Sequence, residues 1–342
     1  MARSFRAAPA ILALAIAAPL LAQGGLSVRH KLAVGGEGGW DYVTLDGAAH
    51  RLYVPRSTHT LVIDTETGSI VADIPDTKGV HGVALAADLN RGFTSNGADT
   101  SVTIFDLRTN AVIEVVKGTG INPDAILYEP TTRRVFTFNG RSNDATVIDA
   151  VNGKIIGTVK LSGKPEFSQT EAGVVYVNIE NKEGSITAID AKTMKVTADW
   201  KMADCEEPSG LAIDHRFKRL FSVCGNKQMK VVDFGTGKLV ASLPIGGGTD
   251  GVAFDEGTQL AVASNGADGT ATVVHQDGAD RYTVAGTVPT QRSARTIGVD
   301  PKTHRFYLPA ASFEPARAPT AEVPRPRAKM IAGSFTILVM DR

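Results

Sequence analysis

The sequence predicts an all-β fold made of seven four-stranded antiparallel units in a ring, and three observations support this prediction. An aspartate in a short polar turn recurs at intervals of 41 to 43 residues, at Asp64, Asp106, Asp149, Asp190 and Asp233. Alternating apolar and polar runs flank these turns, which is typical of short strands. The chain is also rich in glycine, with 35 in 342 residues. Four strands in a repeat of this length form the blade of a β-propeller.

Each unit begins with two strands, a and b, joined by a short polar turn. The clearest examples are "TLDGAAHRLYV" (44–54), "LYEPTTRRVFT" (127–137), "AIDHRFKRLFS" (212–222) and "GVDPKTHRFYL" (298–308). A loop then leads to strand c, and the aspartate turn leads to strand d, as in "GKIIGTVKL". Two stretches, "GFTSNGADTSVTIFD" (92–106) and "AVASNGADGTATVVH" (261–275), are therefore strand b, the b–c loop and strand c of units two and six. Their Asn-Gly pair favours a tight turn.

The seventh unit ends at "FTILVMDR" and lacks a strand d. The segment "LSVRHKLAVGG" (26–36) resembles the missing strand, so we expect the N-terminal strand to close the ring beside the C-terminal strand. This closure would remove the free edge that an open ring exposes.

Residues 1–22 have the pattern of a secretory signal peptide, with Arg3 and Arg6 before an apolar run from Ala7 to Leu21. We therefore expect a periplasmic or secreted protein whose residues 23–342 form one propeller domain. Residues 23–342 contain 34 basic and 36 acidic side chains. This balance gives no overall basic surface for nucleic acid.

The blade pattern, including "RLYV", "VIDTETG" and "NPDAILYEP", resembles the YVTN-type seven-bladed propellers of the periplasmic YncE-like group. The resemblance covers residues 23–342 and implies the fold. It says less about activity, because that broad group includes DNA-binding proteins, surface-layer proteins and distant lactonase-like enzymes, and propellers host many functions.

The residues that open the seven a strands differ from blade to blade, although all of them should surround one end of the central channel. Counting back from the strand b markers gives Asp41, His81, Asp124, Glu166, Ser209, Asp250 and Arg295. Turn-forming residues would tend to repeat in every blade, whereas an asymmetric ring suits an asymmetric ligand. The alternative is that some of these residues only cap turns.

We predict ligand contacts from the charged members of this ring and from Glu207 and Arg141. Carboxylates held close together need an opposite charge nearby. Arg295 and protonated His81 supply part of it, and a divalent cation on Asp124, Glu166 and Asp250 would supply the rest. No other cofactor is predicted. Cys205 and Cys224 lie on the same face of blade five, and we expect them to form a disulfide in an exported chain.

An insertion at about 309–333 separates strands b and c of the seventh blade. It carries five prolines between 309 and 326, which favour an extended segment, and a basic set of Arg317, Arg325, Arg327 and Lys329. This arm is interpreted either as a lid over the acidic channel mouth or as a solvated loop.

The main functional hypothesis is an exported, non-enzymatic propeller that binds a small molecule or a protein at its channel mouth. No catalytic sequence motif is present, which supports this hypothesis. One alternative is a lactonase-type hydrolase in which His81 acts as base, Glu166 orients it and Arg295 stabilises the oxyanion. A second alternative is nucleic-acid binding through the basic arm.

Overall fold

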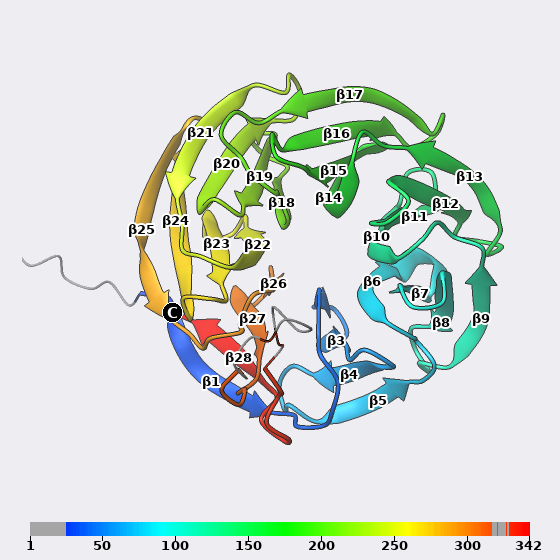
Figure 1. Cartoon of the computed structure of the whole chain (residues 1–342), viewed down its shortest axis with the longest axis horizontal. Coiled ribbons are helices and arrows are strands. Elements are labelled where there is room, and N and C mark those ends of the chain that lie inside the picture. The colour runs from blue at the N-terminus through cyan, green and yellow to red at the C-terminus, as the bar shows by residue number, and fades with distance from the viewer. Residues whose placement is uncertain (1–24, 317–319, 321–325, 327) are drawn as a thin grey trace, which may run out of the picture.

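The computed structural model describes residues 25–316, 320, 326 and 328–342. These residues form seven four-stranded antiparallel sheets arranged as a ring (Figure 1). The sequence prediction of a seven-bladed β-propeller is therefore confirmed. We number the sheets one to seven in the chain order of their innermost strands.

In sheets one to six the chain starts at the innermost strand and ends at the outermost strand (Figure 1). From inside to outside, these sheets contain β2 (Thr44–Asp46), β3 (Arg51–Pro55), β4 (Thr60–Asp64) and β5 (Ile70–Ile74); β6 (Val80–Ala86), β7 (Arg91–Asn96), β8 (Ser101–Asp106) and β9 (Val112–Lys117); β10 (Pro123–Glu129), β11 (Arg134–Asn139), β12 (Asp144–Asp149) and β13 (Ile155–Lys160); β14 (Lys164–Glu171), β15 (Val174–Glu180), β16 (Ser185–Asp190) and β17 (Lys195–Lys201); β18 (Leu211–Asp214), β19 (Arg219–Cys224), β20 (Gln228–Asp233) and β21 (Leu239–Pro244); β22 (Thr249–Asp255), β23 (Leu260–Asn265), β24 (Thr270–Gly278) and β25 (Arg281–Pro289). A short 3-10 turn, η1 (Ala87–Leu89), links β6 to β7.

The seventh sheet joins the two ends of the chain. It contains β26 (Gly298–Asp300), β27 (Arg305–Ala310), β28 (Thr336–Asp341) and, outermost, β1 (Ser27–Ala33). Strand β1 pairs antiparallel with β28, from Ser27 opposite Asp341 to Ala33 opposite Thr336. The expected ring closure by the N-terminal strand is confirmed.

The recurring aspartates stabilise the turns between the third and fourth strands of a sheet. Asp64 Oδ1 accepts hydrogen bonds from the backbone N–H groups of Glu66 and Thr67, at 3.1 and 2.9 Å, and from the Thr67 hydroxyl. Asp106 and Asp233 accept the equivalent bonds in their own turns. The aspartates therefore recur in the sequence because the same turn recurs in each sheet and needs a side-chain hydrogen-bond acceptor.

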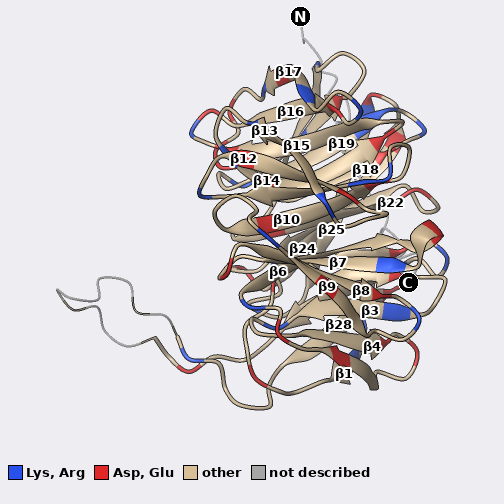
Figure 2. Ribbon diagram, turned by 90° about the vertical axis from the view of Figure 1, so that its right-hand side faces the viewer, with Lys and Arg blue, Asp and Glu red and all other residues tan. Residues whose placement is uncertain are grey.

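The hydrophobic core lies between neighbouring sheets. Between sheets two and three, for example, Phe93 and Ile104 pack in one cluster with Val135 and Ile148, and all four side chains are fully buried. Charged residues lie mainly in the loops at the strand ends (Figure 2). This division between core and surface places the polar chemistry at the two faces of the ring.

The predicted insertion corresponds to the segment 311–335 between β27 and β28. Its base extends the strand ladder, because Phe313 and Met330 form an isolated β-bridge and the Glu314 N–H donates to the Lys329 carbonyl at 2.8 Å. The Phe313 ring also lies 6.2 Å from the Trp40 ring. The arm arginines, Arg317, Arg325 and Arg327, lie outside the described residues, so the lid hypothesis stays a prediction.

Deleting residues 315–328 and joining Glu314 to Lys329 through a short turn should leave the ring folded. We expect a change in the free energy of unfolding of less than about 1 kcal/mol, because loop length has a weak effect on stability. Chemical denaturation measures this change. A longer deletion, 312–331, also removes Phe313 and Met330 and should be clearly more destabilising. If the shorter deletion lowered the free energy of unfolding by clearly more than about 1 kcal/mol, and by as much as the longer deletion, the outer part of the arm would support the fold.

Candidate functional site

Local distortions of the inner strands direct the predicted ring residues toward the axis. The pairing of the inner strand with its neighbour is irregular between Val80 and Val83, between Pro123 and Ile126, between Pro165 and Ser168, and between Thr249 and Gly251. His81, Asp124, Glu166 and Asp250 lie within these irregular segments. A β-bulge changes the direction of a side chain and commonly occurs next to functional sites.

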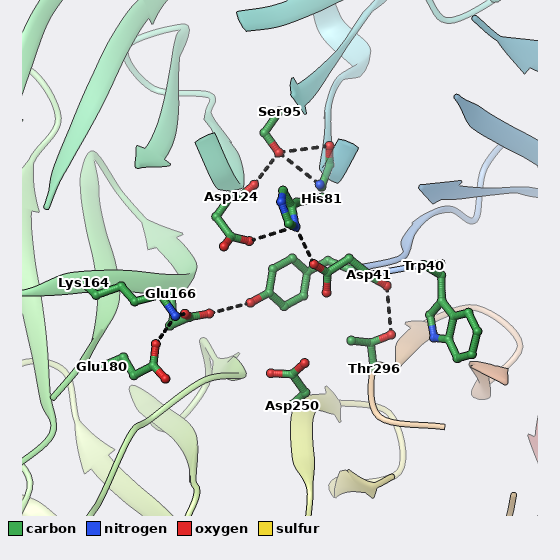
Figure 3. Close-up of polar contacts among 12 residues, drawn as sticks. Trp40, Asp41, His81, Ser95, Asp124, Lys164, Glu166, Glu180, Asp250 and Thr296 are labelled. Atoms are coloured by element: carbon green, nitrogen blue, oxygen red, sulfur yellow. Dashed lines mark hydrogen bonds and ion pairs between the residues drawn. The ribbon is translucent and has the colours of Figure 1, made fainter. Parts of the chain in front are cut away.

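The remaining ring residues, Asp41, Ser209 and Arg295, lie just before β2, β18 and β26. Adjacent sheets are tied together here by backbone bonds, because the Tyr42 N–H donates to the His81 carbonyl and the Asp250 N–H donates to the Arg295 carbonyl. The structure thus brings six of the seven predicted ring residues together in what we call the rim cluster: Asp41, His81, Asp124, Glu166, Asp250 and Arg295, together with Tyr42, Lys164 and Glu180. Figure 3 shows the cluster without Arg295.

One side of the rim cluster is centred on His81. Its Nδ1 donates to Asp41 Oδ2 at 2.7 Å and lies 3.5 Å from Asp124 Oδ1 (Figure 3). Arg295 donates to the other oxygen of Asp41 at 3.1 Å and also forms an ion pair with Asp250. The Arg295 guanidinium therefore compensates two carboxylates, whereas Asp124 is compensated by the imidazole and, from further away, by Lys164.

The other side of the rim cluster is centred on Glu166. Tyr42, from the segment before β2, donates its hydroxyl hydrogen to Glu166 Oε2 at 2.9 Å. Lys164 Nζ lies 2.6 Å from Glu166 Oε1 and also forms an ion pair with Glu180. The Tyr42 ring packs 4.8 Å from the Phe167 ring. Because sheets one and four lie on opposite sides of the ring (Figure 1), Tyr42 reaches across its centre and forms the floor of the cluster.

Burial shifts the protonation equilibria of the acidic groups on this floor. Asp124 is 9% exposed and Glu166 is 6% exposed. Burial raises the pKa of Asp124 to about 6, and it raises the pKa of Glu166 to about 8 with a further contribution from the charge of Asp124. Burial alone would lower the pKa of His81, but the hydrogen bond with Asp41 and the charge of Asp124 outweigh it and leave a raised pKa.

The repeated Ser-Asn-Gly-Ala-Asp stretches position rim residues. The Ser95 hydroxyl accepts from the Gly82 N–H at 3.0 Å and donates to the Asp124 carbonyl of the next sheet. The Ser264 hydroxyl donates in the same way to the carbonyl of Arg295 at 2.5 Å. Each stretch therefore holds the backbone of a charged residue in the neighbouring sheet.

The glycines of these stretches provide the space that rim side chains occupy. A Cβ on Gly97 would lie 2.9 Å from Nε2 of His81, and a Cβ on Gly266 would lie 2.7 Å from Cβ of Arg295. The asparagines have a structural role, since Asn96 Nδ2 donates to the Ser101 and Thr103 hydroxyls at 3.0 and 2.9 Å.

Three predicted positions lie outside the rim cluster. Ser209 donates its hydroxyl hydrogen to the Thr249 carbonyl at 3.2 Å and adds no charge. Arg141 is exposed in the loop after β11, where its backbone N–H donates to Ile121. Glu207 is also exposed and lines a neighbouring pocket of about 500 Å³ with Lys164, Glu180, Asn181, Lys182 and Glu206.

The predicted cation ligands are rearranged by these contacts. Among the described residues, the group of metal-ligand types whose donor atoms all lie within 4.8 Å of one another is Asp41, His81 and Asp124. Glu166 is engaged by Tyr42 and Lys164, and Asp250 is engaged by Arg295. Of the predicted set of Asp124, Glu166 and Asp250, only Asp124 belongs to this group.

Sequence reasoning did not include Tyr42, Lys164 and Glu180 among the site residues. Lys164 lies two residues before Glu166, and this alternation on a strand places both side chains on one face. That signal could have identified the lysine. Glu180 comes from the end of β15, and its approach to Lys164 depends on strand pairing that no local motif indicates.

Cys205 and Cys224 form the predicted disulfide, with Cα atoms 5.3 Å apart. Both residues are buried in sheet five beside the segment that carries Glu206 and Glu207. A disulfide is typical of an oxidising compartment. None of the described residues forms a helix of the length and hydrophobicity needed to cross a membrane.

Comparisons with known proteins identify the fold. No model of a protein family matches the chain, and no curated protein matches it. Among solved structures, a chain of Kuenenia stuttgartiensis hydrazine synthase is 15% identical with a TM-score of 0.71, and the match covers 80% of this chain and 94% of that one.

Two further structures superpose with a TM-score of 0.74 at 8% identity. They are U3-55K, covering 92% of this chain and 99% of that one, and the RRP9 WD40 repeats, covering 90% and 96%. At these identities the similarity establishes the propeller fold alone. The predicted membership of the YVTN-type group stays a prediction.

Proposed function

We propose that this chain is an exported β-propeller binding protein whose rim cluster takes a small organic cation, such as a primary amine or a polyamine. The charge balance of the cluster carries this proposal. Besides Glu166, whose pKa of about 8 keeps it largely protonated near neutral pH, four carboxylates, those of Asp41, Asp124, Glu180 and Asp250, meet two permanent cations, Lys164 and Arg295. A partly buried excess of negative charge favours a cationic ligand.

The pocket beside the cluster could hold the rest of such a ligand. It has a volume of about 500 Å³ and shares Lys164 and Glu180 with the cluster. Glu206 and Glu207 add two carboxylates, and Lys182 adds one cation. A polyamine with one amine near Glu180 and another near Glu207 would use both the cluster and the pocket.

Export is supported by the Cys205–Cys224 disulfide, because structural disulfides persist in oxidising compartments. The signal peptide expected at residues 1–22 is consistent with export, although it lies outside the described residues. A periplasmic location would also agree with the resemblance to the YncE-like propellers.

Calorimetry with putrescine and spermidine at low salt tests the binding proposal, with a neutral sugar and a dicarboxylate as comparison ligands. We expect the amines to bind the wild type and to bind Glu180→Gln/Glu207→Gln at least about tenfold more weakly, a loss of about 1.4 kcal/mol. The matched control is Glu171→Gln/Glu256→Gln, which removes two glutamates near His215 and should bind like the wild type. Absence of amine binding to the wild type, or equal losses in both variants, would refute the proposal.

A lactonase-type hydrolase remains the second candidate, because the 2.7 Å bond from His81 to Asp41 resembles a base held by an orienting carboxylate. In this hypothesis Asp41, which is hydrogen-bonded to His81, would take the role predicted for Glu166, and Arg295 lies beside Asp41. A lactone panel with and without divalent metal ions, repeated on His81→Ala, distinguishes the two functions. Turnover that depends on His81 would favour the hydrolase.

Nucleic-acid binding through the basic arm is the third hypothesis. It rests on Arg317, Arg325 and Arg327, which lie outside the described residues, so no contact of the structure supports it.

A further inference from the structure

We infer that Asp41, His81 and Asp124 form a binding site for one divalent transition-metal ion, such as Zn²⁺ or Mn²⁺. The site lies on the His81 side of the rim cluster. It shares Asp41 and Asp124 with the acidic cluster of the proposed amine site, but it does not use the pocket residues Glu180 and Glu207. The inference goes beyond the proposed function because it assigns a metal-ligand set, and the chelator titration below separates the two.

The spacing of the donor atoms suits a shared metal ion. His81 Nδ1 lies 2.7 Å from Asp41 Oδ2 and 3.5 Å from Asp124 Oδ1, and all three donor atoms lie within 4.8 Å of one another. Two ligands that are each about 2.1 Å from a tetrahedral ion lie about 3.4 Å apart. The Asp124 spacing already matches this value. The Asp41 spacing must widen by less than about 1 Å as the ion replaces the proton on Nδ1.

An independent observation is the weak pairing of the Asp124 carboxylate. This residue is only 9% exposed, and its side chain receives no hydrogen bond from the residues that the structure describes. Its nearest cationic partner is His81 Nδ1 at 3.5 Å, which is longer than a hydrogen bond. Buried polar groups normally have partners. A metal ion between Asp124 and His81 would provide one.

The backbones of the three ligand residues are held in place before any ion binds. The carbonyl of Asp41 accepts from the Thr296 hydroxyl at 2.9 Å, that of His81 accepts from the Tyr42 N–H at 3.1 Å, and that of Asp124 accepts from Ser95. Such supporting bonds are typical of metal sites, where they orient the ligands.

The side chains are oriented as well. Arg295 binds Oδ1 of Asp41, which leaves Oδ2 directed at His81. The lack of a side chain on Gly97 leaves room for the imidazole edge that carries Nε2, so Nδ1 is the nitrogen directed at both carboxylates. The ligand atoms of Asp41 and His81 are therefore already directed at one another before an ion binds.

The donor set determines the class of metal. One imidazole nitrogen with two carboxylates suits Zn²⁺, Mn²⁺ and related ions, whereas Ca²⁺ and Mg²⁺ prefer oxygen ligands alone. The ligand set predicted from the sequence, Asp124, Glu166 and Asp250, contains only oxygen donors and would favour alkaline-earth ions. The set inferred from the structure, Asp41, His81 and Asp124, includes a nitrogen donor and favours transition-metal ions.

Titration calorimetry and elemental analysis on the chelated full chain test this inference, with Zn²⁺, Mn²⁺, Mg²⁺ and Ca²⁺ as separate probes. We expect one Zn²⁺ or Mn²⁺ per chain, and binding at least tenfold weaker in both His81→Ala and Asp124→Asn. The control is His215→Ala, which removes another His–carboxylate pair, with Glu171, and should bind as tightly as the wild type. Co²⁺ gives a further readout, because a visible ligand-field band reports nitrogen and oxygen coordination and should disappear in His81→Ala.

Several results would overturn the inference. They are no transition-metal binding by the wild type, undiminished binding by a folded Asp124→Asn, or Ca²⁺ and Mg²⁺ binding as tight as Zn²⁺. Circular dichroism identifies any variant that fails to fold, and the nearly isosteric Asp124→Asn then decides the outcome. Amine titrations in the presence of a chelator separate the two proposals, since amine binding that persists without metal binding refutes only the metal site.

Discussion

Replacing Cys205 and Cys224 together with alanine is expected to lower the free energy of unfolding by about 3 kcal/mol. The disulfide joins residues that are 19 positions apart, and closing a loop of that length restricts the unfolded chain by roughly this amount. In a chain of this size, the same loss lowers the melting temperature by about 4 to 5 °C. Chemical denaturation and a thermal scan measure the two quantities.

Alanine is the suitable replacement because both cysteines are buried and a serine hydroxyl would add an unsatisfied polar group. Wild type unfolded in the presence of a reducing agent provides the control, and it should approach the stability of the alanine variant. Equal denaturation midpoints for the oxidised wild type and the variant would show that the disulfide adds no stability.

Replacing Glu166 with glutamine should stabilise the protein in alkaline solution and have much less effect in acid. The pKa of Glu166 is raised to about 8 by burial, from an ordinary value of 4.5. The folded protein therefore holds a proton that the unfolded chain releases above pH 4.5. As a result, the contribution of Glu166 to folding becomes less favourable as the pH rises from about 4.5 to about 8, and it is constant above that.

Glutamine removes this dependence and keeps a hydrogen-bond acceptor for Tyr42. We expect the variant to gain on the order of 3 kcal/mol over the wild type at pH 9, relative to their difference at pH 4. Urea denaturation at a series of pH values gives the curves. Glu183→Gln, at an exposed position in the same sheet, should leave the pH dependence unchanged. Parallel curves for wild type and Glu166→Gln would contradict a raised pKa.

The fold could be predicted because its determinants are local and repeated. The aspartate turns at Asp64 and Asp106 each need one acceptor in a fixed position, and that need leaves a period in the sequence. Ring closure could be predicted for a related reason, since the seventh unit lacks one strand and residues 26–36 have the pattern to supply it.

The rim cluster could be predicted only in part. The strand frame identified His81, Asp124 and Arg295 because the start of every inner strand faces the same end of the ring. Their pairing could not be deduced, because it depends on bulges and on the side-chain reach of Tyr42 across the ring. Those bulges direct His81 toward Asp41 and Asp124, so the metal ligands inferred from the structure differ from the set predicted by the sequence.

The pairing of β1 with β28 has a consequence for the order in which the molecule assembles. Of the described strands, β1 is synthesised before all the others and its partner β28 after them, so β1 must wait for its partner until the strands between them have been made. Contacts between such distant parts of a chain slow folding, although the entropy of closing the loop grows only slowly with its length. Sheets two to six can form from local hairpins before then, while the seventh sheet is still incomplete. A chain truncated before β28 would keep an unpaired strand in the seventh sheet, and other chains could add to that strand.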